Sequence, residues 1–227
     1  MPVTIPQILL TLHIAAGVLS LVLFWIPLIT KKGRSLHRKF GIAYVYMMYT
    51  VLITSIILSV IRFSAGSYGA GLALLFLGIL TAVPLLSGMQ ILNAKKPSPE
   101  YRKLRLFLAS LLLAISIVLF AGWQILDNGL LLGFAIIGLL GSFADFRRFT
   151  RPTGSGKTWL REHYEGMLFS GAAAYTAFFA FGGRTILGDI LTGWWTLIPW
   201  LLPSLLTIAL LPLVHRRFKQ AKKVAVG

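Results

Sequence analysis

The chain has 227 residues, of which 57% are hydrophobic and only 12% charged, and it carries a formal net charge of +16. Soluble domains average about 25% charged residues, whereas here most apolar residues stand in blocks of about 18 residues or more, long enough to cross a bilayer as a helix. This composition excludes a soluble domain and predicts a multi-pass membrane protein. Because the chain has no cysteine, disulfides, iron–sulfur clusters, thiolate zinc sites and cysteine nucleophiles are also excluded.

Seven apolar blocks predict an all-α membrane bundle that forms a single domain. The fifth block is short, but the turn sequence Asp127-Asn128-Gly129 in front of it predicts that the fourth and fifth helices are antiparallel neighbours. The predicted transmembrane helices cover residues 5–29, 40–61, 68–92, 104–126, 129–144, 163–181 and 194–214, and a basic cytoplasmic tail follows at 215–227.

The lysines and arginines predict how these helices are oriented. Twenty of the 22 lie in four groups of five, after the first, third, fifth and seventh blocks, and only Arg62 and Arg184 lie on the other side. Because loops rich in Lys and Arg stay in the cytoplasm, we expect the N-terminus outside and the C-terminus inside a bacterial cytoplasmic membrane. The first block has no basic residue before it, so we expect a retained span rather than a cleaved signal peptide.

The same distribution argues against several partners and activities. Every basic group lies at the end of a span, so no basic module is left to bind nucleic acid. Residues 153–158 resemble the end of a phosphate-binding loop, but Arg151 stands where that motif needs its first glycine, so no nucleotide site is predicted. The middle of each span lacks Asp, Glu, Lys and Arg, which disfavours ion pumps and proton-coupled carriers. The four basic groups are expected to attract anionic lipids to the cytoplasmic face.

Four histidines are the candidates for chemistry. His13 lies about eight residues into the first span, roughly 12 Å from its outer end. There it either hydrogen-bonds to a hydroxyl or a freed carbonyl of a neighbouring helix, or contacts a ligand such as a quinone oxygen or a haem iron. His37, His163 and His215 are expected at the cytoplasmic face, about 25 Å from His13. His13 therefore cannot share a metal ion with them.

The cytoplasmic ends of the second and sixth spans are the predicted site. His37, Gly41 and Tyr44 lie at i, i+4 and i+7, on one face of the second helix. His163 and Ser170 on the sixth helix have the same seven-residue spacing as His37 and Tyr44. This pattern predicts either a helix-packing seam with a polar end or a pocket between the two helices.

Two kinds of cofactor are compatible with that site. His37, His163 and Glu165 form a set of two histidines and a carboxylate, which suits zinc or non-haem iron. A haem would use the same two histidines, with Tyr44 on the same helix face, or His13 in the outer half. Against a metal, no single helix carries a His-x-x-x-His pair.

A sequence motif adds a resemblance. A histidine in the first span, followed by His37-Arg38-x-x-Gly41-x-x-Tyr44, resembles a family of bacterial multi-pass membrane proteins that is known only as a domain of unknown function; His163-x-x-x-Met167-x-x-Ser170 is similar to its second histidine motif. The resemblance implies a bacterial inner-membrane protein with functional histidines, and it supplies no activity. The family has arginine where this chain has Ile42, so an anion or haem-propionate contact at that position is not implied.

The leading functional hypothesis is a non-catalytic binding or accessory membrane protein with a polar pocket at the cytoplasmic ends of the second and sixth spans. Polar residues are few in the spans, and small residues mark seams where helices pack closely. Such a protein would pack against a membrane partner or a second copy of itself. No catalytic residue is assigned, because no Ser–His–Asp grouping emerges and the carboxylates are expected in loops.

Two alternatives remain. One is a redox protein that binds haem or a metal through His37 and His163, or through His13. The other is a carrier for a neutral or apolar solute, which would pass between helices kinked at residues such as Pro27 and Pro84.

Overall fold

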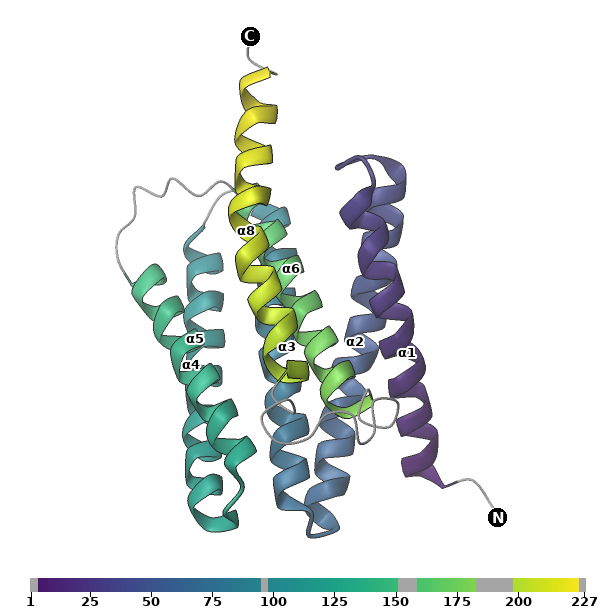
Figure 1. Ribbon diagram of the computed structural model, residues 1–227, viewed down its shortest axis with the longest axis vertical. Coiled ribbons are helices and arrows are strands. Elements are labelled where there is room, and N and C mark those ends of the chain that lie inside the picture. The colour runs from purple at the N-terminus through teal and green to yellow at the C-terminus, as the bar shows by residue number, and fades with distance from the viewer. Residues whose placement is uncertain (1–3, 95–97, 151–158, 183–197, 225–227) are drawn as a thin grey trace.

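The computed structural model describes residues 4–94, 98–150, 159–182 and 198–224, except for the side chains of Ala94, Ala180 and residues 217–224. This part of the chain is entirely helical, as Figure 1 shows. Its elements are α1 (Ile5–Ile29), α2 (Ser35–Ser64), α3 (Tyr68–Ala94), α4 (Pro99–Leu126), α5 (Gly129–Phe149), α6 (Trp159–Ala177), a π-helical turn η1 (Phe178–Gly182) and α8 (Ile198–Val224). Residues 153–158, Arg184 and residues 194–197, on which sequence predictions were made, lie outside the described residues.

Six of the described helices, α1 to α5 and α8, are long and apolar enough to cross a membrane. The chain is therefore an all-α, multi-pass membrane protein, as its composition predicts. The short fifth block is among the six, because α5 has 21 residues and so reaches about 30 Å. The tight turn before α5 is also confirmed: Asp127 is left-handed with φ 47°, and the Asn128 side chain accepts a hydrogen bond from the Leu130 N–H.

Several helices extend further at their charged ends than hydropathy predicts. α2 begins at Ser35 rather than at 40, and α4 begins at Pro99 rather than at 104. Hydropathy marks only the part of a helix that matches the hydrocarbon layer, about 20 residues, whereas backbone hydrogen bonding continues into the interface. The prediction that the carboxylates lie in loops is therefore wrong for Glu100, Asp145, Glu162 and Glu165, which lie on α4, α5 and α6.

Successive helices run in opposite directions, so the bundle has two distinct ends (Figure 1). α1, α3, α5 and α8 finish at the end that is uppermost in the figure, and α2, α4 and α6 begin there. We call it the basic end, because it holds every lysine and arginine of the described residues except Arg62. The described members of the four groups, which are separate in the sequence, therefore lie at one end of the bundle.

α6 differs from the other helices in composition. The sequence predicts a span at 163–181, and α6 with η1 covers all of it, but α6 is not among the six apolar candidates. α6 packs against α3, α8 and α1, and Glu162, Glu165, Ser170 and Thr176 on it are buried. Other helices rather than lipid cover these polar side chains. The count of seven crossings stays a prediction.

The apolar core lies between α3, α4 and α5. Phe76 of α3 stacks on Phe134 of α5 with ring centroids 4.9 Å apart, and Leu119 of α4 is fully buried in the same cluster. α3 also contacts α2 and α6. α3 is therefore the helix against which α2 and α6, the helices of the predicted site, are positioned.

Candidate functional site

Two glycines set the distance between α3 and α6. A Cβ atom built on Gly166 would lie 2.6 Å from the Pro84 carbonyl oxygen and 2.8 Å from the Cα of Gly88. Only a residue without a side chain allows two helix backbones to approach this closely. The contact brings the first turns of α6, and His163 with them, against the backbone of α3.

His163 and His37 each hydrogen-bond to a backbone carbonyl of a neighbouring helix. Nδ1 of His163 lies 2.8 Å from the oxygen of Gly88 on α3, and Nδ1 of His37 lies 3.0 Å from the oxygen of Pro27 on α1. A carbonyl oxygen only accepts, so both Nδ1 atoms carry the proton and donate it. In this tautomer each Nε2 keeps its lone pair, which is the form in which imidazole binds a metal.

The two histidines both lie at the basic end, His37 on the first turn of α2 and His163 in the first turns of α6. Lys32 shares an acceptor with His37, because the Pro27 carbonyl accepts from both. Lys32 donates hydrogen bonds of 2.6 Å to the carbonyls of Pro27 and Leu28, and desolvation lowers the pKa of its ammonium group. We call His37 and His163 the histidine pair; as the sequence predicts, they belong to the same end of the bundle.

Tyr44 lies farther along α2 than His37 and is buried against α6. Its side chain is 2% exposed, and its hydroxyl lies 2.9 Å from Oγ of Ser170 on α6. Seven residues separate it from His37, which is about 10 Å along the helix. The ring of Phe24 lies 5.8 Å from that of Tyr44 and presses against Gly171. Tyr44 therefore joins α2 to α6 below the histidines.

His13 lies in the opposite half of the bundle from the histidine pair. Its Nδ1 is 2.8 Å from Oγ1 of Thr54 on α2, and Thr54 itself donates to the carbonyl of Thr50 at 2.7 Å. Since the Thr54 proton is used in that bond, Thr54 accepts from His13. This is the arrangement in which His13 bonds to a hydroxyl of a neighbouring helix. Fourteen residues, or about 21 Å of α1, separate His13 from Pro27.

Glu165, the third predicted metal ligand, belongs to a different cluster at the basic end. Its carboxylate accepts from Nε of Arg161 at 2.7 Å and from Nε2 of His215 at 3.0 Å, and it pairs with Nη1 of Arg148 at 3.6 Å. His215 thus faces a carboxylate rather than the histidine pair. Within the described residues, no group of three or more His, Asp and Glu side chains is placed to hold a metal ion.

The cluster around Glu165 extends across four helices, and we call it the ionic network. Arg148 also pairs with Glu162, and the Tyr101 hydroxyl donates to that carboxylate at 3.3 Å. Arg105 bonds to Asp145 at 2.5 Å. Its members are Tyr101, Arg105, Asp145, Arg148, Arg161, Glu162, Glu165 and His215, on α4, α5, α6 and α8.

The ionic network was missed from the sequence, although a signal for it exists. The chain has only six acidic residues, and four of them lie within four residues of an arginine: Glu100, Asp145, Glu162 and Glu165. The last three belong to the network. In a chain so poor in carboxylates, such placement at helix ends indicates pairing. The paired charges neutralise one another, so the network is suited to fastening helices together rather than to binding a substrate.

Comparison of the chain with protein-family models, with curated proteins and with solved structures finds no match. The geometry of the residues described above is therefore the basis for assigning a function.

Proposed function

We propose that this multi-pass membrane protein is a non-catalytic binding protein of a bacterial cytoplasmic membrane, and that it binds haem through the histidine pair at the basic end. The proposal combines the pocket expected between the second and sixth spans with the haem-binding alternative. A bound haem supplies one-electron transfer; no residue of the chain is assigned a catalytic role.

The observation that carries the proposal is the hydrogen bonding of the two imidazoles. Nδ1 of His37 and Nδ1 of His163 each donate to a backbone carbonyl. Histidines that bind a metal almost always donate their other ring N–H in this way, which fixes the ring and raises the basicity of the ligating nitrogen. Both rings are partly buried, so each lone pair is held in a defined direction near the membrane surface.

The number of ligands favours haem over a single divalent metal. Zinc and non-haem iron need three or four protein ligands, and the carboxylate that would complete such a set, Glu165, is bound to two cations and a histidine. Haem would bring four nitrogen ligands of its own and would need only one or two from the protein. Two histidines are sufficient for that role.

The surroundings of the histidine pair suit an anionic cofactor. Lys32 and His37 bond to the same carbonyl of Pro27, and Arg34, Arg38 and Lys39 are on the adjoining segment of the same end. The propionate groups of a haem are negatively charged, so these cations would attract them. The same basic surface supports the further proposals that this end faces the cytoplasm and attracts anionic lipid.

Absorption spectroscopy of the purified chain tests the proposal. After reconstitution with haem in detergent, the wild type is expected to show a Soret band that titrates to one haem per chain. His37→Ala and His163→Ala should each weaken binding at least tenfold, because each removes an axial ligand.

The chain supplies a matched control in His215, which lies at the same end but bonds to Glu165. His215→Ala should keep the Soret band of the wild type. A colourless wild type after reconstitution, or equal loss of the band in all three variants at unchanged thermal stability, would contradict haem binding by the histidine pair.

A further inference from the structure

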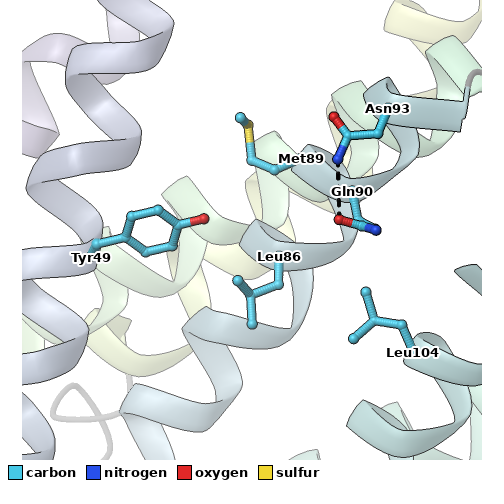
Figure 2. Close-up of a pocket in the computed structure, with 6 residues that line it drawn as sticks. All are labelled: Tyr49, Leu86, Met89, Gln90, Asn93 and Leu104. Atoms are coloured by element: carbon cyan, nitrogen blue, oxygen red, sulfur yellow. Dashed lines mark hydrogen bonds between the residues drawn. The ribbon is translucent and has the colours of Figure 1, made fainter.

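A second site lies on the side of α3 that faces away from α6. It is a groove of about 330 Å³ between α2, α3 and α4, and it is lined by Tyr49, Leu86, Met89, Gln90, Asn93 and Leu104. Figure 2 shows Tyr49 reaching from α2 toward α3, and Leu104 entering from α4. The volume falls at the lower end of the range for small-molecule sites, roughly 300–1,000 Å³.

The four lining residues of α3 form one continuous face of the helix. Leu86, Met89, Gln90 and Asn93 follow the i, i+3, i+4, i+7 pattern. Gly88, whose carbonyl accepts from His163, points to the opposite side at 100° per residue. The groove and the histidine pair therefore use opposite faces of α3 and need not share a ligand.

The polar groups of the groove are incompletely satisfied. Nδ2 of Asn93 donates to Oε1 of Gln90 over 3.3 Å, which is long for such a bond. Both amides are exposed on a helix that is apolar enough to cross a membrane, and the Tyr49 hydroxyl makes no hydrogen bond to any of the described residues. These groups lie near the end of α3 at the basic end and keep free hydrogen-bonding capacity, so a ligand that hydrogen-bonds to them would be favoured.

We propose that this groove binds the head of a membrane quinone, with Tyr49, Gln90 and Asn93 hydrogen-bonding to its ring oxygens. The phenol and the amides can both donate and accept, so they suit the carbonyls of a quinone and the hydroxyls of a quinol. Met89 and the Tyr49 ring provide a polarisable surface for a flat ring, and Leu86 and Leu104 provide apolar contacts.

Size and charge favour a quinone over a phospholipid. A single substituted six-membered ring suits a groove of this volume, whereas a diacyl phospholipid requires a longer one. None of the lining residues is charged, although an anionic head group would be expected to select a cation. The proposal does not depend on haem binding, since no lining residue belongs to the histidine pair.

Binding of a benzoquinone with a ten-carbon tail to the full chain in detergent tests the proposal. Tyr49→Phe removes one hydrogen bond and should raise the dissociation constant about fivefold. Leu86→Trp fills the groove and should abolish binding. Tyr46→Phe is the matched control, because Tyr46 is one turn away on α2 and is 63% exposed; it should bind as the wild type does.

An azido derivative of the same quinone gives a second readout that does not depend on variants. After illumination, peptide mapping should find the label on Tyr49 or on residues 86–93. Label elsewhere, or equal binding by Tyr49→Phe and Tyr46→Phe, would overturn the proposal. Competition by dioleoylphosphatidylglycerol at an equal mole fraction would also overturn it and identify the groove as a lipid site. Haem spectra of the same variants show whether the histidine pair still binds haem. A failure of quinone binding can then be told apart from a failure of haem binding.

Discussion

At the scale of single residues, Gly166 is the position where a one-carbon change has the clearest structural consequence. The added Cβ of Gly166→Ala would lie 2.6 Å from the carbonyl oxygen of Pro84 and 2.8 Å from the Cα of Gly88, so backbone rather than a flexible side chain must move. Overpacking of this kind costs about 1–3 kcal/mol. We therefore expect a lower free energy of unfolding and a lower Tm in detergent.

Gly133→Ala is the matched control for this prediction. Gly133 is also inside a helix, and a Cβ there meets nothing within 4 Å. Alanine is the better helix former by about 1 kcal/mol, so this variant should be neutral or more stable than the wild type. Equal destabilisation by both substitutions would show that α3 and α6 are not in close contact at Gly166.

The sequence predicts the placement of the histidines, and a hydroxyl partner of His13 as one alternative, but not the hydrogen bonds of the histidine pair. The charge pattern puts His37 and His163 at one end of the bundle and His13 away from them. The acceptors of the pair are backbone carbonyls of Pro27 and Gly88, and a backbone carbonyl has no signature in residue type. Which helices approach closely enough to offer one depends on tertiary packing alone.

At the scale of the helices, the ionic network is expected to hold α5, α6 and α8 together. Arg148→Met removes the cation that faces both Glu162 and Glu165. Glu162 is 7% exposed, and breaking a buried pair from one side costs about 3–5 kcal/mol because it leaves an unpaired charge. Thermal unfolding in detergent should therefore show a marked loss of stability.

The neighbouring Arg147→Met separates this effect from a general loss of positive charge. Arg147 is exposed on the same turn of α5, and surface charges contribute little, about 0–1 kcal/mol. A fall in Tm that is similar for the two variants would mean that the network contributes little to stability.

The approximate positions of the helices could be predicted from composition, but the residues at which they begin and end could not. The apolar blocks identify each described helix, including the short α5. The blocks 129–144 and 163–181 stop next to Asp145 and Glu162, whereas α5 and α6 carry these residues within helical turns. Charges can continue a helix when they find partners on neighbouring helices, and hydropathy contains no information about partners.

At the scale of the whole molecule, the absence of cysteine makes the predicted orientation directly measurable. Single-cysteine variants Ser35→Cys, Ser67→Cys and Gly227→Cys sample the start of α2, the turn between α2 and α3, and the C-terminus. In inverted bacterial membrane vesicles, an impermeant maleimide should label Ser35→Cys and Gly227→Cys, and it should leave Ser67→Cys unlabelled until detergent is added. We expect this labelling pattern because loops rich in Lys and Arg stay in the cytoplasm, and 20 of the basic residues are predicted on one side.

Labelling of the C-terminal variant also decides whether α6 crosses the membrane. With seven crossings, Gly227→Cys reacts from the same side as Ser35→Cys; with six, it reacts from the side of Ser67→Cys. The second pattern would contradict both the odd number of spans and the assignment of the basic end to the cytoplasm.

The buried polar face of α6 has a consequence for how the protein is made. The helices before it, α1 to α5, are apolar enough to enter the bilayer as they leave the ribosome. α6 carries Arg161, Glu162 and Glu165 in its first turns, and charged residues oppose insertion by the translocon. Its partners α3 and α1 are synthesised before it, and α8 after it. The predicted crossing of the membrane by α6 would therefore be a folding event that depends on helices already in place, and a nascent chain that lacks α3 should lose α6 to the aqueous phase.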